Sequence, residues 1–291
     1  MLPLEFYFDA AIKGLLTGSV YAMLAVGLSI IFGVMRVVNF AHGEMLVAGM
    51  FGAYLVFTWF GLDPILAIPI VAIVMFVFGV ALQRGLIDRF IAAPEHQQFL
   101  LLIGIALILT NGLDMIFGPD ARGVIVPYAF SSFEVGPFFV DNVRVYSAVT
   151  ALALIALLYL FFNHSRTGKA IRACADNNLG AQVVGLNVSR LYAITFGIGA
   201  ACAGAAGCLL IMVIDVTPHL GADFTLLAFT IVIIGGLGSM TGALLGGLLI
   251  GVSEAMAGIL IQPSLKSSFS FGLLILVLLL RPNGLLGKRP S

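Results

Sequence analysis

The chain has 291 residues, of which 61% are hydrophobic and 10% are charged, and its mean hydropathy is +1.14. This composition excludes a water-soluble globular domain and indicates an integral membrane protein. The 14 basic and 14 acidic residues cancel. The chain therefore offers no net charge to a nucleic acid, and none is expected as a partner.

Apolar segments follow one another along the whole chain, and the longer ones can each cross about 30 Å of hydrocarbon as a helix. They leave no room for a soluble domain between them and cover residues 10–34, 41–60, 64–82, 99–117, 145–162, 191–214, 224–234, 242–261 and 268–280. We predict an all-α fold: a polytopic helical membrane protein with about 8–9 transmembrane segments, in which residues 1–291 form one transmembrane domain.

One apolar segment, 224–234, is too short to cross unaided, because its 11 residues extend only about 16 Å as a helix. The loops 83–98 and 163–190 and the tail after residue 281 are basic, which predicts that all three lie in the cytoplasm. An even number of crossings must then separate residue 190 from the tail. This requires residues 224–241 to cross, and it predicts nine spans with an external N-terminus and a cytoplasmic C-terminus.

Polar residues interrupt the apolar pattern between residues 33 and 44. Backbone freed from helical hydrogen bonding at membrane depth is tolerated only where it faces protein or a water-filled cavity. An alternative is a short cytoplasmic turn with solvated charges, in which the acidic residue caps the next helix. We predict as candidates for a translocation pathway or gate Arg36, Asn39, His42 and Glu44.

A second interruption lies at residues 235–242, where glycines follow the short apolar segment. Interrupted segments in corresponding positions of two halves indicate an inverted-repeat transporter with broken helices and a pathway at the breaks. The two interruptions correspond only in their position between apolar segments, because they share no sequence repeat. Gly235 and Gly236 join the pathway candidates on this ground.

The loop 163–190 is the longest basic segment. Its residues Lys169 to Ala175 are predicted to form a short amphipathic helix with Lys169 and Arg172 on one face. Such a helix-turn-helix loop offers a surface to a cytoplasmic partner.

The chain contains no G-x-x-x-x-G-K-[ST] phosphate loop and no hydrolase motif, and its three cysteines lack metal-ligand spacing. We therefore predict no catalytic residues, no bound metal and no enzyme activity.

Three motifs together resemble one known family. They are Asn39-Phe-Ala-His-Gly-Glu44, then Arg166-Thr-Gly-Lys-Ala-Ile-Arg172 with Gly185-Leu-Asn-Val188, and then Gly235-Gly-Leu-Gly-Ser with Thr241-Gly-Ala. In this order and spacing, over nearly the whole chain, they resemble permease subunits of branched-chain amino acid ABC importers of the LivH type.

The resemblance implies a bacterial inner membrane protein that forms the pathway for branched-chain amino acids. The implied partners are a second homologous permease subunit, two cytoplasmic ATPase subunits, a periplasmic solute-binding protein and membrane lipid. ATP and Mg would be bound by the ATPase subunits, so that this chain needs no cofactor. The family's ATPase-coupling loop falls on 163–190, and its candidate residues are Arg166, Gly168, Lys169, Arg172, Asp176 and Gly185.

Two other functions remain open at this point. An ABC permease for urea, amides or other small organic solutes would share the same motifs. A secondary transporter driven by Na⁺ or H⁺ could use Glu44 or Glu254 as its coupling carboxylate, but it would give the loop 163–190 no purpose.

Overall fold

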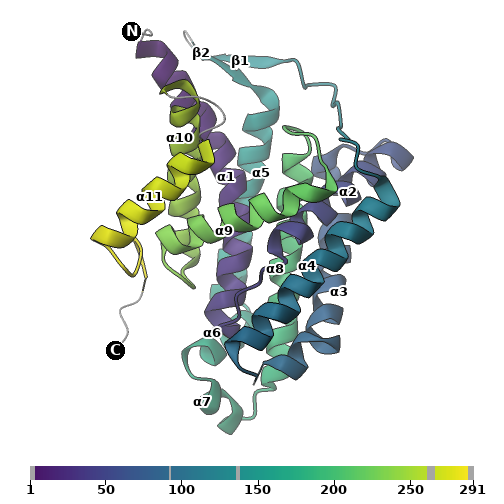
Figure 1. Ribbon diagram of the computed structural model, residues 1–291, viewed down its shortest axis with the longest axis vertical. Coiled ribbons are helices and arrows are strands. Elements are labelled where there is room, and N and C mark those ends of the chain that lie inside the picture. Colours follow the sequence, from purple (N-terminus) through teal and green to yellow (C-terminus); the bar gives the residue numbers. More distant parts are fainter. Residues whose placement is uncertain (1–3, 92, 136–137, 261–265, 288–291) are drawn as a thin grey trace.

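The computed structural model is a bundle of helices, and it describes residues 4–91, 93–135, 138–260 and 266–287 (Figure 1). The helices are α1 (Leu4–Met35), α2 (His42–Phe60), α3 (Pro64–Gly85), α4 (Glu95–Phe117), α5 (Asn142–His164), α6 (Arg166–Asp176), α7 (Asn178–Val183), α8 (Val188–Leu210), α9 (Gly221–Gly235), α10 (Met240–Leu260) and α11 (Lys266–Leu280). In the described residues, eight helical segments are long and apolar enough to cross a membrane, and a shorter apolar helix covers Phe269–Leu280. The predicted polytopic all-α fold is confirmed.

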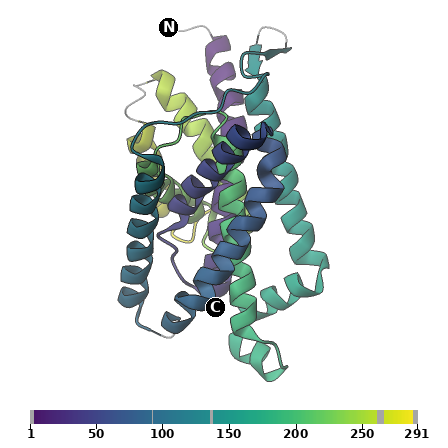
Figure 2. The ribbon, with the colours of Figure 1, turned by 90° about the vertical axis from the view of Figure 1, so that its right-hand side faces the viewer.

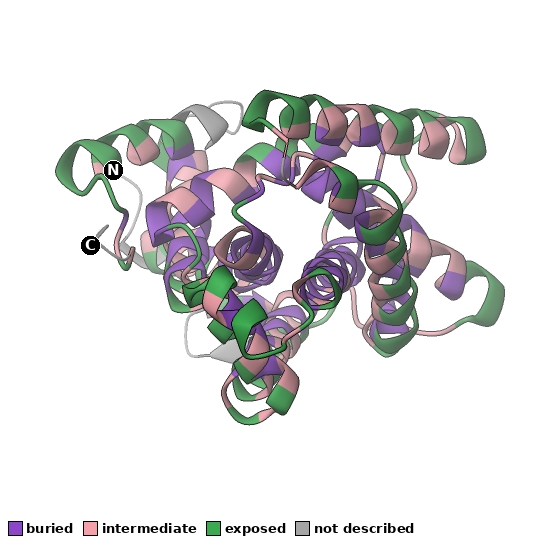
Figure 3. Cartoon of the chain, turned by 90° about the horizontal axis from the view of Figure 1, so that it is seen from below, coloured by how far each residue is buried: buried purple, intermediate pink, exposed green. Residues whose placement is uncertain are grey.

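Helices α1 and α8 form the centre of the bundle, with 72% and 83% of their apolar windows buried. Seen from below, buried residues gather on the central helices and exposed residues on the outer ones (Figure 3). Small residues permit the close packing: a Cβ on Gly27 of α1 would lie 2.7 Å from the Cβ of Cys202 on α8. The cysteines Cys174, Cys202 and Cys208 are free and buried.

Both α8 and α10 run antiparallel to α1. Gly27 lies beside Cys202 and Gly199 of α8, whereas Gly14 and Gly18 lie beside residues 247–255 of α10. Helix α8 therefore ends toward the N-terminal end of α1, whereas α10 begins toward the C-terminal end of α1. The chain must return from one level to the other between these two helices. It does so through α9, which lies across the neighbouring helices in Figure 1. The predicted passage of residues 224–241 thus occurs as an oblique helix, not as a straight span; the 3₁₀ helix Pro218–Leu220 runs directly into it, and a non-helical stretch follows it.

The two basic loops between helices lie at the same end of the molecule. The hydroxyl of Ser189, at the start of α8, donates a 2.8 Å hydrogen bond to Asp88, in the connection between α3 and α4. Helices α6 and α7 form the lower tip in Figures 1 and 2, opposite the N-terminus. This agrees with the predicted side for the loops 83–98 and 163–190, while the direction of the molecule in the membrane stays a prediction.

The opposite end carries a hairpin that the sequence analysis did not predict. Strands β1 (Ser132–Val135) and β2 (Phe138–Asp141) pair antiparallel, with Ser132 opposite Asp141. The segment 118–131 leads to this hairpin, and Arg122 pairs with Val216 through backbone hydrogen bonds of 2.9 and 2.8 Å. This pairing anchors the stretch that leads into α9.

The first interruption is a re-entrant stretch. Helix α1 ends at Met35, yet Nε2 of His42 lies 3.0 Å from the carbonyl oxygen of Leu24. Leu24 precedes Met35 by 11 residues, which corresponds to about 16 Å of helix. Residues 36–41 therefore run back alongside α1, and α2 starts at a level well inside the bundle. A short turn outside the bundle, the alternative in the sequence analysis, does not fit this geometry.

Candidate functional site

The first turns of α2 and α9 meet inside the bundle. The backbone N–H of Gly43 donates a 2.8 Å hydrogen bond to Oγ1 of Thr225. A Cβ on Gly43 would overlap the carbonyl oxygen of Gly221, so the two backbones are in direct contact. The first N–H groups of a helix have no partner within the helix. Here α9 supplies one to α2.

Glu44 contributes a carboxylate to this contact, and it is 5% exposed. Its Oε2 lies 3.2 Å from Oγ1 of Thr225, and the same hydroxyl lies 3.4 Å from the carbonyl oxygen of Phe40. A hydroxyl carries one proton and can donate it to one of these acceptors while it accepts from Gly43. The positive ends of two helix dipoles favour a carboxylate at this position.

Asn39 and His42 lie beside Gly43 and Glu44 in the chain, and both are fully buried. Oδ1 of Asn39 accepts a 3.1 Å hydrogen bond from the backbone N–H of Ala41, which closes a tight turn just before α2. Nε2 of His42 must donate to Leu24, because a carbonyl only accepts, and Nδ1 has no partner among the described residues. We call Asn39, His42, Glu44 and Thr225 the central polar cluster.

The other pathway candidates lie outside this cluster. Arg36 is exposed and ends α1 with a positive φ of 56°. Gly235 lies at the far end of α9, ten residues after Thr225, which corresponds to about 15 Å. Packing accounts for both glycines: a Cβ on Gly235 would overlap the carbonyl of Gly242, and Gly236 has a φ of 104°. A pathway role stays a prediction for all six candidates.

Thr225 was not among the predicted site residues. It lies within the apolar segment 224–234, and its contact with Gly43 joins residues 182 positions apart. No local pattern marks such a pairing. The cluster ties α2 to α9, so any movement of one helix relative to the other must break buried hydrogen bonds.

Replacing Thr225 with valine is expected to destabilise the protein, because it leaves the buried N–H of Gly43 without a partner. The expected cost is about 1–3 kcal/mol. Thr225→Ser keeps the hydroxyl and is expected to unfold at a temperature close to that of the wild type. Thermal unfolding of the two variants in detergent checks this. A Thr225→Val variant as stable as the wild type, with the loss confined to Thr225→Ser, would mean that the methyl group, and not the hydrogen bond, matters.

The loop 163–190 forms the predicted helix-turn-helix. Ser165 caps α6 by accepting a 2.9 Å hydrogen bond from the N–H of Gly168. Gly168, Ile171 and Cys174 share the buried face of α6, and a Cβ on Gly168 would overlap the carbonyl of Phe161 on α5. Burial also raises the pKa of the Cys174 thiol. The predicted amphipathic helix at residues 169–175 is confirmed as part of α6.

The outward surface of this loop is partly basic and partly apolar. Arg166, Lys169 and Arg172 are exposed on α6. Nη1 of Arg172 also donates a 2.9 Å hydrogen bond to Asn163, which ties α6 to the end of α5. After α6, three apolar side chains are strongly exposed: Leu179 (76%), Val183 (87%) and Val184 (75%). We call these three residues the α7 apolar tip. Gly185 ends α7 with a φ of 84°.

Comparison with known proteins gives consistent matches over nearly the whole chain. A family model described as the permease component of branched-chain amino acid transport systems matches residues 10–278. The high-affinity branched-chain amino acid transport system permease protein BraD of Pseudomonas aeruginosa is 31% identical, and the alignment covers 97% of this chain and 96% of that protein. The corresponding LivH protein of Escherichia coli is 32% identical with the same coverage. A probable LivH protein of Methanocaldococcus jannaschii is 26% identical over 91% of this chain and 88% of that protein.

Proposed function

Because the chain belongs to the family of branched-chain amino acid transport system permeases, we propose that it is the membrane-spanning subunit of an ATP-binding-cassette importer. In this role it forms the translocation pathway for branched-chain amino acids delivered by a periplasmic binding protein. The names of its relatives, which state branched-chain amino acid transport, favour this substrate over urea or amides. A second, homologous permease subunit completes the pathway in the bacterial inner membrane.

The observation that carries the proposal is the surface formed by α6 and α7. It projects at one end of the bundle, and it places exposed cations beside the α7 apolar tip. Exposed apolar side chains rimmed by charge are typical of a protein interface. We propose that two cytoplasmic ATPase subunits dock here and on the second permease. They bind ATP and Mg, for which this chain has no phosphate loop.

The central polar cluster supports a gating role in the same proposal. It joins α2, which begins at the first interruption, to α9, which ends at the second, through hydrogen bonds of 2.8 and 3.2 Å. Movement of α6 relative to the membrane would reach this cluster through α1 and α8, against which α6 packs. A binding protein supplies affinity for the substrate, so the cluster need not bind an amino acid tightly.

A secondary transporter is the second candidate, with Glu44 or Glu254 as the coupling carboxylate. The contacts favour it less. Oε2 of Glu44 is engaged by Thr225 at a close helix contact, and Oε1 of Glu254 accepts a 3.3 Å hydrogen bond from Ser270. Both carboxylates thus connect neighbouring helices through hydrogen bonds, which is a structural role and not one in ion coupling.

Lys169→Glu is expected to weaken binding of the ATPase subunits and to lower ATP-dependent uptake in parallel. Lys169 is a cleaner choice than Arg172, whose replacement would also remove the hydrogen bond to Asn163. Co-purification of the ATPases and uptake of radiolabelled leucine provide the two measurements. Arg84→Glu is the matched control, because Arg84 is exposed at the same end but lies outside α6 and α7.

The expected loss for Lys169→Glu is about three- to fivefold in binding, typical of one exposed interfacial charge reversed. The control is expected to stay within twofold of the wild type. Equal ATPase binding by both variants and by the wild type would remove α6 from the docking surface.

A further inference from the structure

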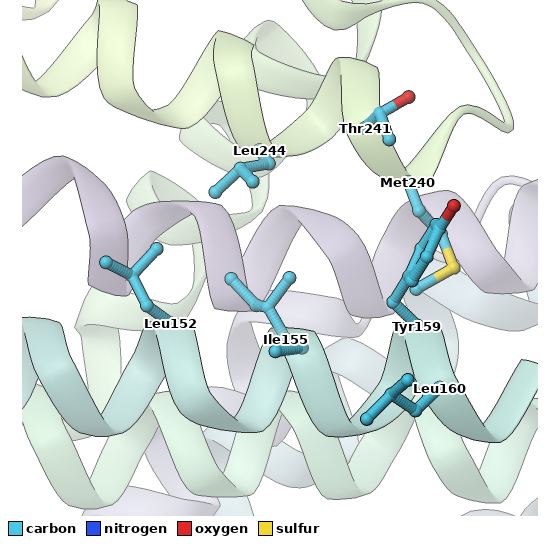
Figure 4. A pocket seen from close by; sticks show the side chains of 8 residues that line it. Leu152, Ile155, Tyr159, Leu160, Met240, Thr241 and Leu244 are labelled. Atoms are coloured by element: carbon cyan, nitrogen blue, oxygen red, sulfur yellow. The ribbon is translucent and has the colours of Figure 1, made fainter.

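An open apolar groove runs between α5 and α10. Both helices pack against α1, and the space between them is a cavity of about 340 Å³ (Figure 4). Its walls include Leu152, Ile155 and Ala156 of α5 and Leu244 of α10. All four belong to helices long and apolar enough to cross a membrane. In such a location the surrounding medium is hydrocarbon.

One end of the groove has two hydroxyl-bearing residues among its apolar ones. Tyr159 of α5 and Thr241 of α10 lie together at the end where α10 begins, while Leu152 lies at the other end (Figure 4). Leu152 and Tyr159 are seven residues apart on α5, which corresponds to about 10 Å. The lining of the groove is therefore apolar, and Tyr159 and Thr241 mark the end that lies toward the start of α10.

Positively charged residues follow the end of the groove that is marked by Tyr159 and Thr241. Helix α6 follows α5 directly, and its exposed Arg166 and Lys169 come seven and ten residues after Tyr159. Arg36 is exposed at the corresponding end of α1, the helix that lies between α5 and α10. Long cationic side chains near the ends of membrane helices reach the interface with their charged groups. The mouth of the groove thus favours an anionic group.

We propose that this groove binds one acyl chain of an anionic phospholipid, with the headgroup held near Tyr159, Thr241 and the three cations. Charge favours an anionic phospholipid as the occupant: the groove, about 340 Å³ in volume, is lined mainly by apolar side chains that suit an acyl chain, and the three cations lie toward one end of it. Basic pockets between membrane helices are typical binding sites for anionic headgroups. The inference goes beyond the transport function and does not depend on it.

The test measures lipid retained by the purified full-length chain. The protein is equilibrated in detergent with equal amounts of phosphatidylglycerol and phosphatidylcholine of identical acyl chains, and bound lipid is counted by native mass spectrometry. The wild type is expected to retain one phosphatidylglycerol in preference to phosphatidylcholine. Ala156→Trp fills the groove and is expected to lose this lipid. Ala153→Trp is the matched control, because Ala153 is an exposed alanine of the same helix that does not line the groove.

A double variant, Arg166→Gln with Lys169→Gln, is expected to lower the preference for phosphatidylglycerol at least about fivefold, without reducing retention of phosphatidylcholine. Unfolding temperatures of all variants verify that they are folded. Equal retention of the two lipids by the wild type would overturn the proposal. So would an Ala156→Trp variant that keeps its lipid, or one that instead loses a co-purified second permease subunit, since the groove would then hold a helix of that subunit.

Discussion

Replacing Gly43 with alanine is expected to abolish transport and to destabilise the protein by about 1–3 kcal/mol or more. The added Cβ would overlap the carbonyl oxygen of Gly221 and would lie 2.6 Å from Oγ1 of Thr225. The first of these atoms is backbone and cannot rotate away. To make room, α9 must move away from α2, which breaks the hydrogen bond between Gly43 and Thr225.

The matched control for this variant is Gly52→Ala in the same helix. The nearest atoms to a Cβ at Gly52 are the methyl groups of Val71 at 3.5 Å, an ordinary contact distance. Alanine also stabilises a helix relative to glycine by up to about 1 kcal/mol. Thermal unfolding and leucine uptake of the two variants provide the comparison. If Gly43→Ala is as stable and active as Gly52→Ala, α2 and α9 do not meet at this point.

The second large effect is expected at the α7 apolar tip. Introducing aspartate at both Leu179 and Val183 is expected to weaken ATPase binding at least about a hundredfold, because two apolar anchors of the interface would become charged. Both side chains are more than 75% exposed, so the permease itself should fold normally. Binding of purified ATPase subunits to the detergent-solubilised permease measures the effect.

Ile125→Asp is the control for this prediction. Ile125 is also a strongly exposed apolar residue, at 72%, but it lies in the segment 118–131 at the opposite end of the molecule. It is expected to leave ATPase binding unchanged. An α7 variant that binds the ATPases like the wild type would exclude the apolar tip from the interface, whatever the role of Lys169.

The helices were predictable from the sequence because hydrophobic runs near 20 residues have few alternatives in a membrane. The amphipathic helix α6 was predictable for a related reason: Gly168, Ile171 and Cys174 recur at helical spacing, while Lys169 and Arg172 place charge on another face. The charge pattern placed the loops 83–98 and 163–190 together, and the bond between Ser189 and Asp88 agrees.

The path of the chain through the bundle was less predictable. Hydrophobicity does not distinguish a helix that crosses from one that lies obliquely, as α9 does, because both are surrounded by apolar side chains. The depth of the stretch 36–41 depends on the contact of His42 with Leu24, and the cluster depends on Thr225. These are long-range contacts without a local sequence pattern. Arg36, Gly235 and Gly236 were grouped with the cluster by their sequence context, but the fold separates them from it.

Uptake of radiolabelled leucine into proteoliposomes tests the central claim most directly. The vesicles contain this chain, its second permease subunit and the ATPase subunits, with the binding protein supplied on the substrate side and ATP on the other. We predict uptake that requires ATP and the ATPase subunits and is indifferent to Na⁺ or H⁺ gradients. Uptake by the permease subunits alone that follows an ion gradient and ignores ATP would contradict the account and would identify an ion-coupled transporter.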